Sequence, residues 1–155
     1  MKMSEELGEH KGRKYYSLQE LLDILCEEYN LNKIQLEKIR EYTLSKGKFS
    51  STEDVIYLNI IPGYEIYDYI PVIYHEFRHY WQYLKYYDVY KWWLYDNQDL
   101  YHKTDKSGNR LCYRICELEL DADTFSKSYG EKNQEKILKE FTFNREYYEK
   151  KISLL

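Results

Sequence analysis

The stretch His75-Glu76-Phe77-Arg78-His79 spells HExxH, and it is the most informative part of a 155-residue chain that has only four histidines. Side chains four residues apart on a helix project about 40° from each other, so both imidazoles can reach one cation. Glu76 lies about 100° round the helix from His75, where it can reach a metal-bound water but cannot easily join the ligand pair. The spacing therefore predicts a helix that carries two metal ligands and a general base.

The helix around this motif is expected to begin near Asp68, which can cap it, and to end near Tyr86. Pro71 then falls in the first turn, where a missing amide is tolerated. The positions opposite the two histidines are apolar or aromatic and should pack on the core; they are Ile73, Phe77, Tyr80 and Leu84.

The rest of the chain predicts an α+β fold that is predominantly helical, with a short β-sheet. Residues 1–15 are polar and are expected to form a flexible leader, followed by a single domain over residues 16–155. Ser17 and Glu20 form a capping box for a first helix. Residues 55–60 are rich in β-branched and aromatic side chains and predict a strand.

Two further regions complete the expected order of elements. Residues 31–45 fit either a helix or a strand. Residues 97–110 read as a surface loop, and a second long helix is expected from about Leu111 to near Gly130, where the glycine provides a stop. A charged last helix should follow over residues 131–151.

A catalytic zinc usually takes three protein ligands, so the two histidines need a partner. On one continuous helix, Glu119 and Asp123 border the apolar stripe, whereas Glu117 and Asp121 face water. A carboxylate at the edge of a core requires a partner there. Glu119 is therefore the candidate third ligand, and Asp123 is the candidate acceptor of a hydrogen bond from a ligating histidine.

Charge and composition exclude several classes of function. The net charge is −4, the pI is near 5.6 and the basic residues are scattered, which argues against a nucleic-acid partner. No stretch approaches the roughly 18 to 20 apolar residues of a membrane span, and no signal peptide is visible. Three cysteines without a CxxC pair argue against a disulfide framework. The sequence predicts a soluble cytoplasmic protein with no membrane contact.

Cysteines and aromatic residues each allow two interpretations. Cys112 and Cys116 share the predicted face of Glu119, and we interpret them as small buried apolar residues rather than thiolate ligands. The chain has twenty tyrosines and three tryptophans. In the simplest interpretation, these rings pack at the edge of the core while the tyrosine hydroxyls stay in contact with water. The alternative is an exposed aromatic surface for a partner, around Trp92 and Trp93.

The two motifs together resemble those of the gluzincin metallopeptidases. HExxH is followed about forty residues later by Glu119-Leu120-Asp121-Ala122-Asp123-Thr124-Phe125, which is similar to the family pattern E-x-x-A-D/N-x-F. The order of strand, HExxH helix, loop and glutamate helix also resembles the ImmA/IrrE-like peptidases of phages and other mobile elements. The resemblance covers roughly residues 50–130. It departs from the family at Ser126, where alanine is usual, and no DNA-binding helix-turn-helix is evident.

The resemblance implies a zincin-like fold with one catalytic Zn²⁺ bound by His75, His79 and Glu119. Glu76 would be the general base and Asp123 would orient a ligand. The resemblance also implies that residues 38–45 form a strand, and that the strand over residues 55–60 is a sheet edge that pairs with an extended substrate. The substrate-binding residues of that edge would be Val55, Tyr57, Leu58 and Asn59.

The activity implied is that of a zinc metallopeptidase that hydrolyses peptide bonds in an extended protein segment. The alternative is a zincin-fold module that binds a protein partner without cleaving it. His102 is an alternative third ligand, as in SprT-like proteases. A donor for the transition state could be His102, Tyr113 or Arg114, and the sequence does not rank them.

Overall fold

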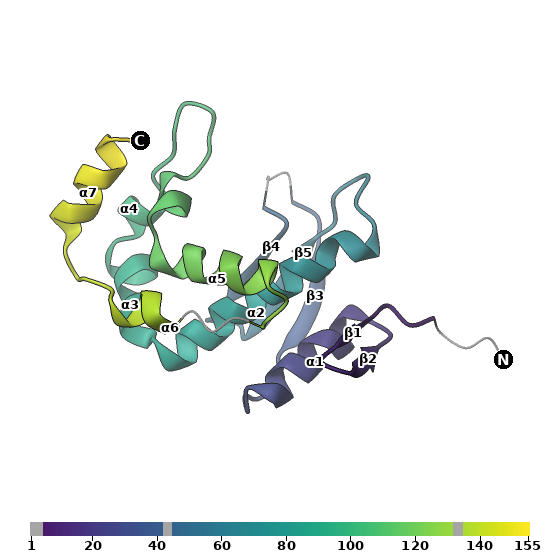
Figure 1. Ribbon diagram of the computed structural model, residues 1–155. Coiled ribbons are helices and arrows are strands. Elements are labelled where there is room, and N and C mark those ends of the chain that lie inside the picture. Colours follow the sequence, from purple (N-terminus) through teal and green to yellow (C-terminus); the bar gives the residue numbers. More distant parts are fainter. Residues whose placement is uncertain (1–4, 42–44, 132–134) are drawn as a thin grey trace. The chain divides into compact units, whose positions relative to one another are not determined.

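The computed structural model describes residues 5–41, 45–131 and 135–155. This part of the chain contains seven α-helices and two small β-sheets, so the fold is α+β, as predicted (Figure 1). The chain divides into two compact units, residues 1–80 and 81–155. The division falls within α2 (Ile70–Lys85).

The first unit holds both sheets. Its elements, in chain order, are β1 (Gly8–His10), β2 (Arg13–Tyr15), α1 (Leu18–Glu28), β3 (Gln35–Ile39), β4 (Gly47–Ser50), β5 (Val55–Asn59), a 3-10 helix (Ile66–Tyr69) and the larger part of α2.

The N-terminal segment forms a β-hairpin. β1 and β2 pair antiparallel, and Lys11 and Gly12 between them have positive φ angles of 48° and 84°, which is the geometry of a type I′ turn. The flexible leader predicted for residues 1–15 is therefore wrong for residues 8–15. No apolar pattern marks this hairpin in the sequence, because a buried polar side chain, His10, holds it in place. Its Nδ1 lies 2.8 Å from the Tyr74 hydroxyl of α2, and its Nε2 lies 2.5 Å from the Glu28 carboxylate of α1.

Helix α1 begins as the sequence predicts. The Ser17 hydroxyl accepts a hydrogen bond from the Glu20 amide at 3.1 Å, and the Glu20 carboxylate accepts one from the Tyr16 amide at 2.5 Å. The buried face of α1 supplies much of the core of this unit, with Leu18, Leu21, Leu22, Ile24, Leu25 and Cys26.

The three-stranded sheet has the order β3-β5-β4. β5 pairs parallel with β3 and antiparallel with β4. The strand predicted over residues 55–60 is confirmed, and the ambiguous segment 31–45 contributes a strand at Gln35–Ile39. The strand implied for residues 38–45 falls partly on residues 42–44, which lie outside the described residues.

The prediction that residues 55–60 form a sheet edge is wrong. β5 is the central strand, so its backbone is paired on both sides along Val55, Tyr57, Leu58 and Asn59. Leu58 and Asn59 are both buried, and the Asn59 side chain forms hydrogen bonds to the backbone. Its Oδ1 accepts from the Glu41 amide at 2.9 Å and its Nδ2 donates to the Ser45 carbonyl at 3.0 Å. The two outer strands are β3 and β4, and β4 is a short segment whose Gly-Lys-Phe-Ser sequence carries a weak strand signal.

Helix α2 follows the 3-10 helix directly. Asp68 caps that 3-10 helix instead of α2, because its carboxylate accepts from the Glu65 amide at 2.8 Å. Pro71 falls in the first turn, as predicted. Of the predicted core face, Ile73, Phe77 and Tyr80 are buried, whereas Leu84 is 46% exposed.

The part of α2 that belongs to the first unit, residues 70–80, packs on the rest of that unit. The ring of Phe77 lies 5.5 Å from that of Tyr29, and the Tyr80 hydroxyl donates to the Asn32 carbonyl at 2.8 Å. These contacts fix the rotation of the helix, and with it the direction in which the motif residues point.

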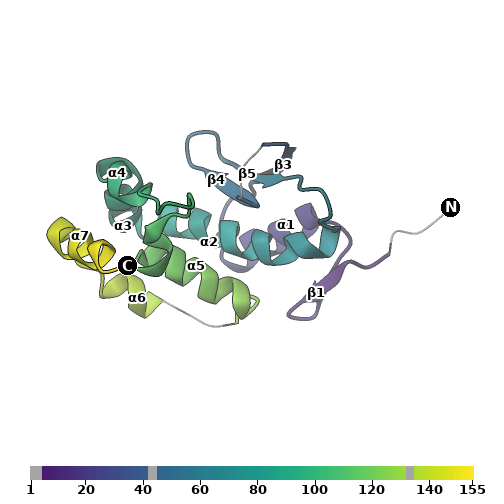
Figure 2. The same cartoon turned by 90° about the horizontal axis from the view of Figure 1, so that it is seen from above.

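The second unit is helical. Its elements are the end of α2, then α3 (Tyr87–Lys91), a π-helical turn (Trp92–Asp96), α4 (Gln98–Tyr101), a 3-10 helix (Leu111–Arg114), α5 (Glu117–Lys127), α6 (Glu135–Lys139) and α7 (Arg145–Ser153). α6 lies beside α5 (Figure 2).

Three sequence predictions for this unit need correction. The segment 97–110 contains α4 and is not all loop. The helix expected from Leu111 to Gly130 is broken at Cys116, whose extended backbone is the N-cap of α5. The last helix is divided into α6 and α7. Helical phase therefore cannot be carried across Cys116.

Trp92 and Trp93 belong to an aromatic core. Trp93 is fully buried, and its ring lies 5.0 Å from that of Trp92 and 4.9 Å from that of Tyr148. Phe141 stacks on Tyr148 at 5.9 Å. The packing interpretation is confirmed for these two tryptophans.

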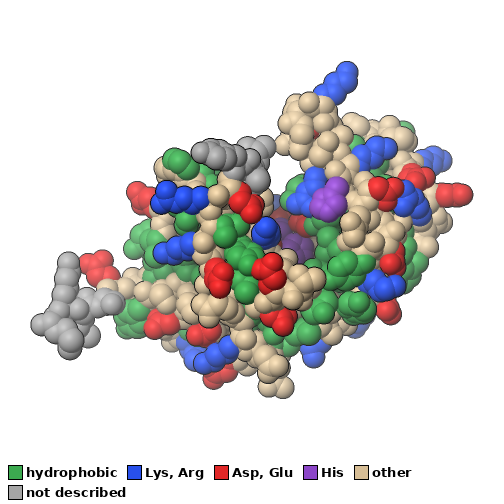
Figure 3. Space-filling model, turned by 180° about the vertical axis from the view of Figure 1, so that it is seen from behind, with side chains coloured by type: hydrophobic (Ala, Val, Ile, Leu, Met, Phe, Trp, Pro, Cys, Tyr) green, Lys and Arg blue, Asp and Glu red, His purple; other side chains and the backbone are tan. Residues whose placement is uncertain are grey.

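The surface carries mixed charge. Acidic and basic side chains are interspersed over the face drawn in Figure 3, so no field of one sign covers that face. Among the described residues, no helix combines the length and the apolar composition needed to cross a membrane.

Candidate metal centre

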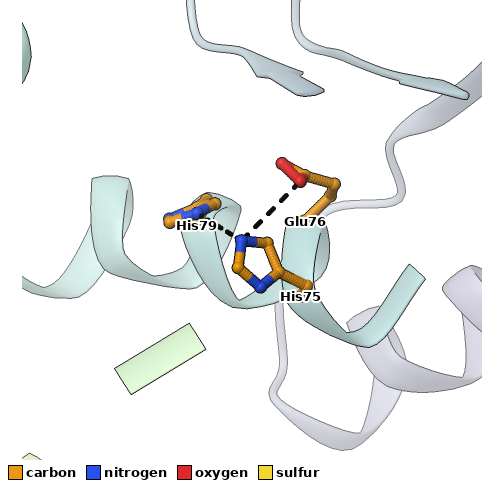
Figure 4. Close-up of side chains that lie close together, drawn as sticks. All are labelled: His75, Glu76 and His79. Atoms are coloured by element: carbon orange, nitrogen blue, oxygen red, sulfur yellow. Dashed lines mark hydrogen bonds and ion pairs between the residues drawn. The ribbon is translucent and has the colours of Figure 1, made fainter. Parts of the chain in front are cut away.

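α2 places His75, Glu76 and His79 together in the first unit. The two imidazoles point toward each other, and their Nε2 atoms are 3.1 Å apart (Figure 4). One Glu76 carboxylate oxygen lies 4.0 Å from Nε2 of His75. One possible ligand atom from each of the three residues lies within 4.8 Å of the others. The helical spacing thus produces the convergence that the sequence predicts for these three residues.

The distance between the nitrogens fits a shared metal ion. Zinc binds imidazole nitrogen at about 2.0 to 2.1 Å, so two nitrogens on a tetrahedral ion lie roughly 3.3 Å apart. The observed 3.1 Å is close to this value. It also permits a hydrogen bond from one ring to the other, and metal binding would replace that bond. The two imidazole nitrogens are therefore close enough for both to reach one metal ion.

The three side chains are largely withdrawn from water. Glu76 and His79 are buried, and the side chain of His75 is 20% exposed. Burying a carboxylate beside two imidazoles is costly unless the groups have partners. A cation shared by the imidazoles, with the carboxylate beside it, would offset that cost.

β4 approaches this part of α2 closely. A Cβ atom added to Gly47 would lie 2.7 Å from Cγ1 of Val72, 2.9 Å from the carbonyl oxygen of Tyr57 and 3.4 Å from Cγ of Glu76. Only glycine fits at this position. This outer strand of the sheet thus passes directly beside the candidate general base.

Glu119 lies on α5 in the second unit and is 2% exposed. Its Oε1 accepts a hydrogen bond from the Tyr101 hydroxyl at 2.6 Å. The carboxylate is therefore buried and oriented, as a metal ligand should be. Its role as the third ligand stays a prediction, as does that of His102, which is exposed after α4.

Tyr101 is a candidate site residue that the sequence analysis missed. Burial, together with the negative charge of Glu119, raises the pKa of its hydroxyl well above the ordinary value. The hydroxyl therefore stays protonated and can donate to the carboxylate at any physiological pH. Nothing in the sequence marks this tyrosine among the twenty in the chain.

The other acids of α5 correct the helical-phase argument. Asp121 was expected to face water but is fully buried, and it accepts a hydrogen bond from Gln82 Nε2 at 2.8 Å. Glu117 is half-buried and accepts hydrogen bonds from Trp93 Nε1, at 3.3 Å, and from the Tyr148 hydroxyl. On the side of α5 that was expected to face water, Trp93 and Tyr148 thus contact Glu117, and Gln82 of α2 contacts Asp121. Asp123 is half-buried, and its orienting role stays a prediction.

The cysteines of the second unit are apolar residues of the core. Cys112 and Cys116 are fully buried. Burial raises the pKa of the Cys112 thiol to about 12, and that of Cys116 is also raised well above its ordinary value. Both are therefore protonated thiols, which agrees with the interpretation that they are not thiolate ligands.

Arg110 completes the surroundings of Tyr101. Its guanidinium carbon lies 4.8 Å from the centre of the Tyr101 ring and 4.6 Å from that of Tyr113. Desolvation and the charge of Arg110 lower the pKa of His102 below its ordinary value. A neutral His102 is suited to accept or donate a hydrogen bond, but not to act as a cation.

Comparisons with family models, with curated proteins and with solved structures found no match to this chain. The resemblance to gluzincins therefore depends on the residues of the two motifs.

Proposed function

We propose that the chain is a zinc metallopeptidase that hydrolyses peptide bonds in an extended protein segment. His75, His79 and Glu119 would bind one Zn²⁺, Glu76 would be the general base, and Asp123 would orient a ligating histidine. The observation that carries the proposal is the convergence of two imidazole nitrogens 3.1 Å apart, with a buried carboxylate 4.0 Å from one of them.

When bound, zinc would supply a water molecule that loses a proton near pH 7. Glu76 would take that proton and pass it to the leaving amine. Its low exposure keeps bulk water away from the carboxylate, which strengthens the interaction with the proton it holds.

The edge strand β4 offers a path for the substrate. Among the described strands β4 pairs only with β5, and Gly47 brings it against Glu76. An extended peptide can add to the edge of a sheet as another strand. We propose that β4, rather than β5, aligns the substrate beside the general base.

The test compares the wild type with Glu76→Gln and His79→Ala. Each protein is loaded with zinc, its metal content is measured by elemental analysis, and cleavage of an unfolded protein mixture is followed by mass spectrometry. Glu76→Gln should keep zinc and lose cleavage by a factor of about 100 or more, because proton transfer contributes that much. His79→Ala should lose zinc as well.

Glu37→Gln is the matched control, because Glu37 is exposed on β3 and away from the motif. It should keep both zinc and cleavage. Cleavage by Glu76→Gln at the rate of the wild type would contradict the assignment of the base. A zinc-loaded wild type that holds a protein partner but cleaves none of the mixture would favour the binding module.

A further inference from the structure

Arg110 is a half-buried cation held between aromatic side chains. Its guanidinium carbon lies over the rings of Tyr101 and Tyr113, at 4.8 Å and 4.6 Å from their centres, and it donates a hydrogen bond to the Tyr113 hydroxyl. Both contacts fix the plane of the guanidinium group. An arginine held in this way loses little further freedom when it binds an anion.

The segment before Arg110 is built to hold its position. Thr104 and Arg110 form a β-bridge, and the Leu111 amide donates to the Lys103 carbonyl at 2.9 Å. Asp105 Oδ1 accepts from the amides of Ser107 and Asn109, at 2.9 Å and 3.0 Å. The loop is therefore closed by hydrogen bonds, and these hold the backbone of Arg110 in position.

No carboxylate among the described residues forms an ion pair with Arg110, although the charge of Glu119 acts on it from a greater distance. None of the ion pairs in the described ranges involves it, although the guanidinium has five N–H donors and matches a carboxylate in a two-bond geometry. By contrast, Arg145, which belongs to the same unit, forms ion pairs with Asp99 and Glu149. Arg110 thus has the capacity for an anion that the protein itself does not supply.

Tyr101 links Arg110 to Glu119, the candidate third ligand. The ring that Arg110 contacts carries the hydroxyl that donates to Glu119 at 2.6 Å. A carboxylate bound at Arg110 would therefore lie one tyrosine side chain away from the candidate third ligand. Tyr101, Arg110, Tyr113 and Glu119 all belong to the second unit.

We propose that Arg110 binds a carboxylate of the peptide substrate and makes the protein selective for peptides that carry one. The inference rests on the proposed function, because it names the substrate class of the same site. The carboxylate can come from the C-terminus of the peptide or from an acidic side chain, and both sources offer the same two-oxygen acceptor.

Three short probes separate these sources. N-acetyl-Ala-Phe carries a terminal carboxylate, N-acetyl-Ala-Phe-amide carries none, and N-acetyl-Glu-Phe-amide carries only a side-chain carboxylate. Binding is measured in the zinc-loaded Glu76→Gln protein, where no turnover occurs, by NMR titration of the arginine Nε–H signals. The Arg110 signal is assigned by its absence from Arg110→Lys.

At least one carboxylate probe should shift the Arg110 signal and bind about 10-fold more tightly than the amide, because a hydrogen bond to a charged group contributes about 1.5 kcal/mol or more. Arg110→Gln should remove this preference. Lys106→Gln changes the net charge equally at an exposed position of the same loop and should retain it. Arg110→Lys keeps the charge without the planar fork and should bind the preferred probe several-fold more weakly than the wild type.

Circular dichroism and thermal unfolding of each variant show whether it is folded, and Arg110→Lys serves as the test if Arg110→Gln is not. Equal binding of amide and carboxylate probes, no shift of the Arg110 signal with any probe, or a preference that survives in Arg110→Gln would overturn the proposal. The proposed function fails separately: a wild type that cleaves nothing but prefers carboxylates keeps the anion site and loses the peptidase assignment.

Discussion

The hydrogen bond from Tyr101 to Glu119 gives the residue-level test of the third ligand. Tyr101→Phe removes the hydroxyl and keeps the ring, so the aromatic packing around it should survive. Loss of a group that orients a metal ligand typically lowers metal affinity about 10- to 100-fold. We expect a decrease of that size, measured by competition with a zinc-binding dye.

Tyr113→Phe is the control for this measurement, because Tyr113 also contacts Arg110 but its side chain is exposed. Its zinc affinity should equal that of the wild type. If Tyr101→Phe also binds zinc as tightly as the wild type, Glu119 is not a ligand.

Buried thiols give a second prediction for single residues. With a pKa raised to about 12, the Cys112 thiol should be ionised in only about one molecule in 10,000 at pH 8, and its burial also blocks reagents. We expect no alkylation of Cys112 or Cys116 by iodoacetamide at pH 8 in the folded chain, and full alkylation of both in urea. Mass spectrometry of the labelled peptides checks this, and rapid labelling in the folded state would contradict the burial of these thiols.

Residues in direct helical register were predictable from the sequence, whereas residues that depend on another element were not. His75, Glu76 and His79 converge because their spacing alone determines it. Glu119 was placed correctly at the buried edge of its helix, but Asp121 was not, because its contact with Gln82 of α2 cannot be read from a single helix. The contact of Tyr101 with Glu119 joins residues 18 positions apart in different helices and has no sequence pattern.

The approach of β4 to α2 is the decisive packing contact between elements. Gly47→Val would bring side-chain carbon within 3 Å of Val72 Cγ1 and of the Tyr57 carbonyl oxygen, so β4 must move away from α2. We expect a loss of about 1 to 3 kcal/mol in the free energy of unfolding. Cleavage should fall more than zinc affinity, because the strand proposed to align the substrate is displaced while both histidines stay on α2.

Urea unfolding, zinc titration and cleavage assays on the same preparation test this order of effects. Lys48→Val is the control, because Lys48 is an exposed neighbour on the same strand and its ion pair with Glu41 is at the surface. A Gly47→Val protein with the stability and activity of the wild type would show that β4 does not need this close approach.

The β1–β2 hairpin gives an element whose attachment should depend on pH. Burial alone would raise the pKa of Glu28, but the hydrogen bonds from Lys11 and His10 outweigh it and lower the pKa below the ordinary 4.5. A carboxyl group with a lower pKa in the folded state stabilises that state above its unfolded pKa, and the contribution is lost as the pH falls through the folded value. Glu28→Gln should therefore be less stable than the wild type at pH 7, and the difference should shrink below about pH 4.

Urea unfolding from about pH 3 to pH 7 measures this difference, and hydrogen exchange of the His10 amide reports on the hairpin itself. Glu27→Gln is the matched control, because Glu27 is an exposed neighbour whose pairing with Arg13 lies at the surface. If the free energies of unfolding of Glu28→Gln and the wild type differ by the same amount at every pH, the ionised Glu28 carboxylate does not stabilise the fold.

Local signals predicted elements well, and non-local pairing did not follow from them. The cap at Ser17 and the strand at β5 depend on neighbouring residues, and both are confirmed. The position of β5 in the sheet depends on β4, a four-residue strand with one aromatic side chain, so the sequence could not show that β5 is central. The N-terminal hairpin was missed because it is anchored by the polar contacts of His10 rather than by an apolar pattern.

At the scale of the whole molecule, the proposed ligands come from both compact units. His75 and His79 lie in residues 1–80 and Glu119 lies in residues 81–155, while α2 runs through the division between them. A metal ion that binds the folded chain and not the unfolded one stabilises the folded state by about 2.7 kcal/mol when the free ion is at 100 times its Kd. We expect a zinc-dependent rise in the unfolding temperature of the wild type, and none for His79→Ala.

Glu119→Ala is the informative variant in this comparison. With only two histidines left, zinc should bind much more weakly, so the rise at a fixed zinc concentration should be smaller than in the wild type and should require more zinc to appear. Asp88→Ala, at an exposed position of the second unit, should respond to zinc as the wild type does. Equal stabilisation of the wild type and Glu119→Ala would mean that zinc is bound by the HExxH histidines without Glu119, and the metal centre would then belong to the first unit alone.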